Sequence, residues 1–465
     1  MPIRSFLFVG LVLGILSGCA TNEVHVKTLS EKEIAEHELI LQEARLHFFQ
    51  GNYEGAIDLV KPLTHELTAN LPLYQSELGI YYLASDNKEK ARQYLFDAYV
   101  SIEDFFDPRT ERRAVSIWGA ETEKVFKGEP YEQATLSFLL GLLLLEEGDI
   151  DNALACFKNG QIADSDVMAE QYNSDYGILQ LMEAKCYGLR GERDRFKEFN
   201  EIAIGSFSKT HPAFLNRHSD LLIGGNISET EIARSSVEKA ILKEKDSIAY
   251  QYRNYYGPLL EPYNNLLLVW TGRSPTLERA GRYGEERIIV MNPQDEIHFE
   301  VKLNQNEWHD TINGFSNIAF QATTRGGRLM DDVLASQADF KRTTEQIGST
   351  MFDMANSTSD PYATVAFLAV GLISGGLSSS ANVSADIRCV QSLPSNIGIV
   401  PLNLSAGSHT VTLHCYDRNL MLTRKLTQTI HVQPKPFQFH IIYVPSLNCE
   451  KKSINEIASQ GQIPH

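Results

Sequence analysis

The chain has 465 residues, 22% of them charged and 43% hydrophobic, with a formal net charge of −17. This composition is typical of a globular protein, and the length predicts two or three domains. The acidic balance argues against nucleic acid and anionic membrane surfaces as partners of the chain as a whole.

The N-terminus carries the first motif. A basic start leads into an apolar run, residues 6–16, and then into Leu16-Ser17-Gly18-Cys19. The run has the length of a secretory h-region and is shorter than the roughly 20 residues of a membrane span. The tetrapeptide resembles the lipobox of bacterial lipoproteins. The resemblance implies a signal peptide over 1–18, a diacylated Cys19, a linker over 19–30 and, with Ala rather than Asp at position 20, an outer-membrane anchor facing the periplasm. The alternative is an ordinary cleavable signal with a chance cysteine.

Residues 31–262 show helical periodicity with a recurring small residue, a short Gly- or Asn-containing turn and a second helix that opens near an alanine. Leu78-Gly79, followed by Tyr82 and Ala91, is the clearest instance. The pattern resembles tetratricopeptide (TPR) repeats. Small residues let paired helices approach closely. The positions expected to do so are Ala44, Ala56, Gly79, Ala91, Gly141, Ala153 and Ala184. A merely similar helical bundle is the alternative.

After residue 262 the periodicity changes to that of strands. We expect strands at 266–270, 287–291, 297–303 and 317–323, then a hairpin over 402–413 and a turn at 417–419. The predicted fold class is therefore α+β multidomain, with a TPR-like α-solenoid followed by a mostly β region. The predicted segments are a β-rich part (263–328), a helix with an apolar Gly/Ser-rich stretch (329–385), a β-sandwich-like module (386–447) and a tail (448–465).

Three further segments resemble a family of bacterial lipoproteins that combine TPR-like repeats with a C-terminal β domain. They are Lys127–Glu132 (KGEPYE), Leu267–Pro275 (LLVWTGRSP) and the run from Ala385 to Pro394 that contains Asp386-Ile387-Arg388. Their order along the chain extends the resemblance over most of the sequence.

The six cysteines show no zinc-like spacing. Cys389 and Cys415 are the best candidates for a disulfide, because both fall in the same predicted β module and the expected compartment is oxidising. Buried thiols are the alternative.

No enzyme motif holds in context. His37-Glu38 and His65-Glu66 lack the second histidine of a zinc helix, and no phosphate-binding loop or nucleophile elbow is present. We therefore predict no catalytic residue, no metal site and no cofactor.

The predicted function is that of an outer-membrane adaptor that binds an envelope protein or peptide through its repeats. Tyr82, Tyr187 and Trp308 are the candidate contacts, with packing as the alternative role of both tyrosines and a solvated loop as the alternative for Trp308. An accessory role in an envelope machine, such as a peptidoglycan synthase or an outer-membrane secretion channel, is the main alternative. A cell-wall hydrolase is a further one. The sequence gives no prediction of oligomeric state.

Overall fold

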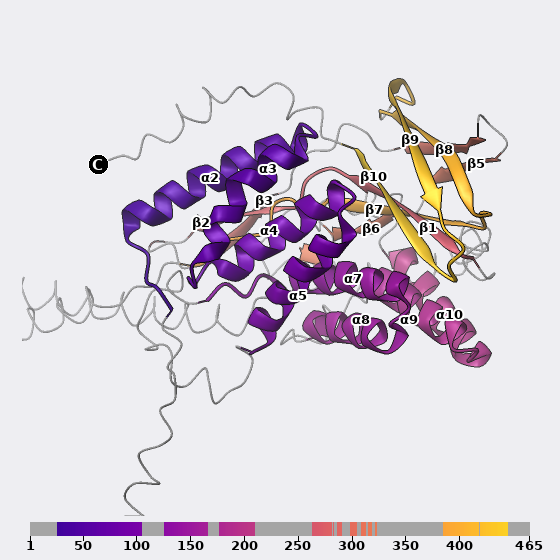
Figure 1. Ribbon diagram of the computed structural model, residues 1–465, viewed down its shortest axis with the longest axis horizontal. Coiled ribbons are helices and arrows are strands. Elements are labelled where there is room, and N and C mark those ends of the chain that lie inside the picture. Colours follow the sequence, from indigo (N-terminus) through magenta and orange to yellow (C-terminus); the bar gives the residue numbers. More distant parts are fainter. Residues whose placement is uncertain are drawn as a thin grey trace, which may run out of the picture.

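A computed structural model describes residues 26–104, 125–165, 176–209, parts of 263–322, 385–417 and 419–444 (Figure 1). The predicted signal peptide, Cys19, the expected helices over 210–262 and the apolar stretch within 329–385 lie outside the described residues. The described part is α+β, with helices first and sheets after them.

The described helices of the first half form four hairpins. They are α2 (Glu31–Phe49) with α3 (Tyr53–Val60), which the short 3-10 helix η1 (Lys61–His65) follows, α4 (Leu71–Ala84) with α5 (Lys88–Asp104), α7 (Pro130–Glu147) with α8 (Ile150–Ser165), and α9 (Gly177–Leu189) with α10 (Arg193–Lys209). Each pair corresponds to one predicted repeat. The third hairpin turns at Gly148, which caps the C-terminus of α7. Its φ of 90° lies in the left-handed region, which glycine adopts readily.

The predicted small residues lie where the helices meet. A Cβ atom on Gly79 would be 2.6 Å from Cγ of Leu95 in α5, so only glycine allows this approach. Gly141 packs in the same way against the ring of Phe157 in α8. The five predicted alanines are fully buried: Ala44, Ala56, Ala91, Ala153 and Ala184. None of the described helices is long and apolar enough to cross a membrane.

In the described part of the chain, ten strands follow the helices. They are β1 (Asn265–Thr271), β2 (Thr276–Ala280), β3 (Glu286–Val290), β4 (His298–Leu303), β5 (Trp308–Ile312), β6 (Phe315–Asn317), β7 (Asn396–Leu402), β8 (Gly407–Tyr416), β9 (Leu422–Val432) and β10 (Gln438–Val444). The first sheet has the order β10-β1-β7-β6 and the second β5-β4-β8-β9, while β2 and β3 form a separate ribbon. In the first sheet β1 is parallel to β10 and antiparallel to β7.

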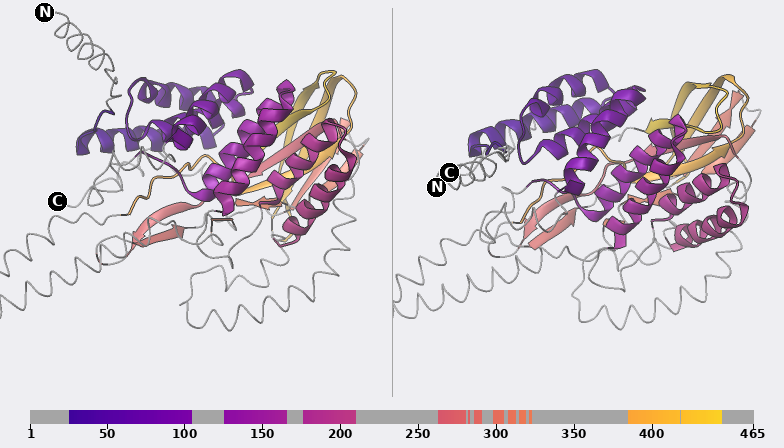
Figure 2. Two further views of the ribbon diagram at one scale, coloured as in Figure 1. Left: turned by 90° about the horizontal axis from the view of Figure 1, so that it is seen from below. Right: turned by 60° about the horizontal axis from the view of Figure 1, so that its bottom comes forward.

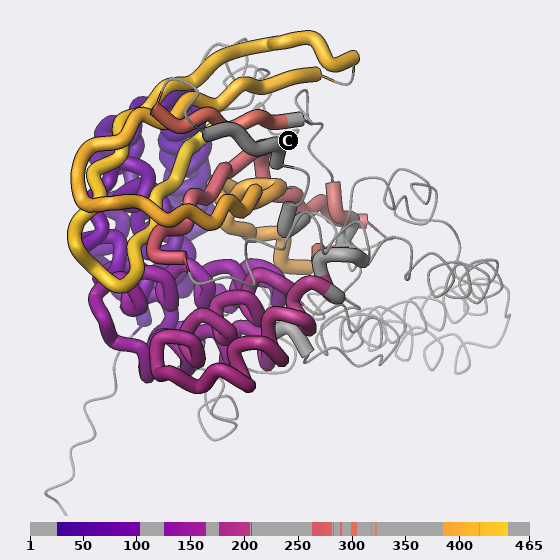
Figure 3. Tube along the Cα trace, turned by 90° about the vertical axis from the view of Figure 1, so that its right-hand side faces the viewer, coloured from indigo at the N-terminus to yellow at the C-terminus, as the bar shows by residue number. Residues whose placement is uncertain are grey.

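The helices, the first sheet and the second sheet form three layers (Figures 2 and 3). Leu266, Leu268 and Trp270 of β1 join the hydrophobic core of the helices. Leu267 and Val269, on the opposite face of the same strand, join the core between the two sheets. Both faces of β1 are therefore covered, which explains why its sequence is apolar without alternation.

Three predictions about the β region need correction. Strands from 263–328 pair with strands from 386–447 in both sheets, so these segments form one β unit rather than two modules. The predicted hairpin over 402–413 is wrong, because β7 and β8 belong to different sheets and the chain crosses between them. The predicted strand over 317–323 ends at Asn317, and the described residues after it are helical.

The predicted disulfide is also wrong. Cys389 and Cys415 are both thiols. Cys389 lies in the irregular segment before β7, where burial raises the pKa of its thiol to about 12. Cys415 lies in β8 and packs in the core between the two sheets. Cys415 is therefore part of the core between the sheets, and Cys389 is buried outside that core.

Candidate functional site

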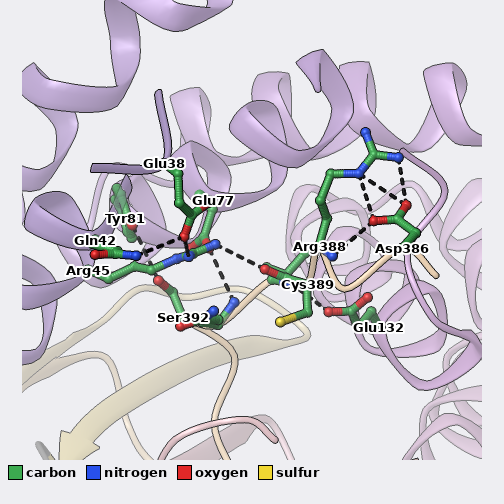
Figure 4. A network of polar contacts seen from close by, with 12 residues as sticks. Glu38, Gln42, Arg45, Glu77, Tyr81, Glu132, Asp386, Arg388, Cys389 and Ser392 are labelled. Carbon is green, nitrogen blue, oxygen red and sulfur yellow. Dashed lines mark hydrogen bonds and ion pairs between the residues drawn. The ribbon is translucent and has the colours of Figure 1, made fainter. Parts of the chain in front are cut away.

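The first helices of the hairpins, α2, α4, α7 and α9, are here termed the inner helices, because charged side chains on each of them reach the β unit. Residues 385–395, termed the inner segment, run between these helices and the first sheet (Figure 4). The segment has no regular secondary structure, so its backbone groups need other partners.

A buried ion pair holds the middle of the inner segment. Nε and Nη2 of Arg45, on α2, each lie 2.8 Å from Oε1 of Glu77 on α4. The side chains are 4% and 0% exposed. Nη2 of Arg45 also donates to the carbonyl of Cys389 at 3.0 Å, and the N–H of Gln391 donates to Glu77 at 3.2 Å. Burial is the largest single effect and opposes the charge of Arg45, but the neighbouring groups, chiefly Glu77 and Glu38, together outweigh it and raise the pKa of Arg45.

Glu132 binds the same segment from α7. Its Oε1 accepts from the N–H of Val390 at 2.6 Å, and its Oε2 accepts from the N–H of Glu129 at 2.7 Å. One carboxyl group therefore caps its own helix and anchors a segment more than 250 residues away. Burial raises the pKa of Glu132 to about 8, although the two N–H donors act in the opposite direction.

The start of the inner segment is held by Arg388. Its guanidinium makes a two-pronged ion pair with Asp386, with Nη2 at 2.6 Å from Oδ2. Its Nη1 donates to Oδ1 of Asn70 at 2.6 Å, just before α4, and its plane lies over the ring of Phe126. The inner segment thus contacts residues that precede two different inner helices.

Two lysines on the helices bind backbone carbonyls of the β unit. Nζ of Lys88, at the start of α5, donates to the carbonyl of Phe439 in β10 at 2.7 Å and pairs with Glu146 at 2.7 Å. Lys185 on α9 donates to the carbonyl of Tyr263 and lies over that residue's ring. Burial lowers the pKa of Lys185 to about 8.

These contacts have a common chemistry. Carboxylates accept hydrogen bonds from backbone N–H groups, and cations donate to backbone carbonyls. A peptide-binding groove recognises the main chain of a bound peptide through contacts of the same kind. Here the bound peptide is the chain's own inner segment together with the edge of the first sheet.

No family model, curated protein or solved structure matches the chain. The site is therefore interpreted from its own geometry.

The three segments singled out in the sequence meet at this site. Glu132 of the KGEPYE segment binds Val390 of the inner segment. The segment after β1 joins them, since the N–H of Ser274 donates to the carbonyl of Leu393 and the N–H of Ser395 donates to the carbonyl of Thr271. Segments more than 100 residues apart in the chain therefore form one structural junction.

Two of the three predicted partner contacts, Tyr82 and Tyr187, are buried. Tyr82 is buried and stacks on Tyr94 of α5, while Tyr187 is buried against Phe199 of α10. Both tyrosines pack within their own hairpins, so the structure contradicts a contact role for them. Trp308 begins strand β5, paired with Leu303, rather than lying in a loop. Cys19 with Leu16, Ser17 and Gly18 lies outside the described residues.

Within the described residues, no group of three His, Cys, Asp or Glu side chains is arranged to hold a metal ion. The residues that sequence reasoning missed are Arg45, Glu77 and Glu132. Each is a charged residue on an inner helix, and the backbone group that it binds is distant in sequence. Only Glu132 had a signal, because it lies in a segment singled out for other reasons.

Proposed function

We propose that this chain is a lipid-anchored adaptor of the outer membrane that faces the periplasm and binds an envelope protein. Cys19 carries the lipid, and the four hairpins form a short TPR-like solenoid. Support for the solenoid comes from the close contacts of Gly79 and Gly141 between the helices of their hairpins. The inner helices of this solenoid hold the β unit, so the partner surface lies elsewhere.

The second helices of the hairpins, here termed the outer helices, supply that surface. Three of them each expose one large apolar side chain: Phe96 of α5 (49% exposed), Ile162 of α8 (62%) and Ile202 of α10 (40%). Single exposed apolar residues are common, but here three successive second helices each carry one, at different places along the helix. The combination of a filled inner groove and apolar outer helices is the observation that carries the adaptor proposal.

We expect the full lipoprotein, crosslinked mildly in cells and purified, to recover an envelope protein. Replacing Phe96, Ile162 and Ile202 together with serine is expected to reduce this recovery by on the order of tenfold, because apolar anchors dominate interface energies. Leu39→Ser on α2, which removes an apolar side chain of similar exposure (53%), is the matched control and is expected to keep recovery unchanged.

The identity of the recovered protein separates the alternatives. A peptidoglycan synthase or a secretion channel favours the accessory role in an envelope machine. Equal recovery with the triple variant contradicts the outer-helix surface. Turnover of muropeptides by the purified chain, without any recovered partner, supports the hydrolase alternative instead.

The anchor has its own test. We expect radiolabelled fatty acid to be incorporated into the chain in cells, and Cys19→Ser to abolish the label, because the thiol is the acylated group. Cys449→Ser, which removes a cysteine far from the lipobox, is expected to keep the label. Label that persists in Cys19→Ser contradicts the anchor.

A further inference from the structure

The hairpin formed by β8 and β9 ends in an apolar tip. Leu420, Met421 and Leu422 are consecutive and are 65%, 65% and 55% exposed. Elsewhere in the described residues, the exposed large apolar side chains occur singly. Three adjacent exposed apolar residues go beyond the scattered apolar surface of an ordinary soluble domain.

The backbone holds these side chains outward. Oδ1 of Asp417 accepts from the N–H groups of Asn419 and Met421, at 2.8 and 2.9 Å. The backbone of Asp417 also donates to Met421 and accepts from Leu420. Leu420 has a φ of 58°, a left-handed conformation that bulky residues rarely adopt. A turn that keeps a leucine in this conformation and exposes it is a candidate functional feature.

The charge around the tip differs from that of the rest of the chain. The sequence from 418 to 449 contains no Asp or Glu, although the whole chain has 59 such residues. The same stretch carries four Lys or Arg, of which Arg424 and Lys425 lie on β9, one residue beyond the tip. Glu300 lies on β4, which pairs with β8. Its carboxylate is hydrogen-bonded to His414 and Tyr416 and pairs with Lys302. With Asp417 counted, residues 417–449 carry four Lys or Arg and one Asp, so this stretch is cationic within a chain of net charge −17.

We propose that the tip at Leu420–Leu422 inserts into the headgroup region of an anionic phospholipid membrane. Apolar side chains that enter the acyl boundary, followed by cations at headgroup level, form the combination that binds such a surface. The overall charge argued against anionic membranes, but this local charge has the opposite sign. The inference rests on the proposed anchor only in that the lipid at Cys19 keeps a membrane within reach.

The test uses the full chain in proteoliposomes, with an environment-sensitive fluorophore at Met421→Cys in a Cys449→Ser background. The four cysteines that the structure describes are buried, so they are protected from the label. In vesicles that contain phosphatidylglycerol we expect a blue-shifted emission and about twofold or stronger quenching by nitroxide lipids. Vesicles of phosphatidylcholine alone should give a weaker effect, because they lack the anionic charge.

Matched variants separate the contributions. A label at Gln428→Cys, exposed on the same strand but away from the tip, is expected to show no lipid quenching. Leu420→Ser with Leu422→Ser should abolish quenching at position 421. Arg424→Gln with Lys425→Gln should remove the difference between anionic and neutral vesicles. Leu420, Leu422 and Lys425 are exposed and Arg424 is half-buried, so the urea midpoint of the fold should change little.

An unquenched label at position 421 in anionic vesicles overturns the proposal. Protection of that label by a crosslinked envelope protein, without lipid quenching, assigns the tip to a protein partner and also overturns it. Failure of the anchor is read separately, as loss of labelled fatty acid at Cys19, because the probe at 421 reports only the tip.

Discussion

Replacing Arg45 with alanine is expected to destabilise the fold by about 3–5 kcal/mol, the usual cost of removing one partner of a buried ion pair. The variant leaves Glu77 buried without its counter-charge and removes the donor to the carbonyl of Cys389. Because this carbonyl belongs to the inner segment, the loss affects both the pairing of α2 with α4 and the attachment of the β unit.

Urea unfolding of the full chain in detergent measures this effect. Lys32→Ala, which breaks an exposed ion pair with Glu36 on the same helix, is the control and is expected to cost less than about 1 kcal/mol. Arg45→Met combined with Glu77→Met should recover part of the loss, because it removes both charges. A cost for Arg45→Ala that equals that of Lys32→Ala contradicts the structural role of the pair.

The helical half could be predicted well from the sequence because its signals are local. Gly79 and Gly141 mark close helix contacts, and each finds its partner in the next helix, Leu95 or Phe157. The buried strand at β1 was recognisable for the same reason, since a run of consecutive apolar residues indicates cover on both faces.

The β topology and the site could not be predicted in this way. After β7 the chain could form a hairpin or cross to the second sheet, and the choice depends on which strands β7 and β8 pair with. Their partners, β1 and β4, come from a distant segment of the chain. Glu77 and Glu132 look like solvent-exposed helix residues in the sequence. Their ligands, the N–H groups of Gln391 and Val390, are contributed by a segment about 260 to 310 residues later.

The location of the repeat groove has a consequence for the adaptor proposal. Helix α4 is buried on nearly all sides, and in a stack of repeats the neighbouring repeats cover such a helix. Here the cover on its inner side is the inner segment, where Ser392 donates to Tyr81 and Gln391 to Glu77. The repeats therefore serve as the platform on which the β unit is built, and the adaptor proposal assigns the partner contacts to the second helices of the hairpins.

The stability of the fold is expected to depend on pH through Glu132. Its pKa is raised from 4.5 to about 8, chiefly by burial. Between these two values the folded state keeps a proton that the unfolded state releases, so the free energy of unfolding falls as pH rises through this window. The full effect is on the order of a few kcal/mol. Below pH 4.5 and above pH 8 the group adds no further slope.

Glu132→Gln tests this dependence, because glutamine does not titrate and keeps one acceptor for the N–H of Val390. We expect the urea midpoint of the variant to vary less with pH than that of the native chain between the two pKa values. Glu183, whose pKa is raised to about 7 by burial, contributes a slope of the same sign, so the difference between the two proteins is the decisive quantity. Glu89→Gln, on the exposed surface of α5, is the control and should retain the native slope. Identical slopes for Glu132→Gln and the native chain would mean that Glu132 is ionised in the fold, with its two N–H donors outweighing burial.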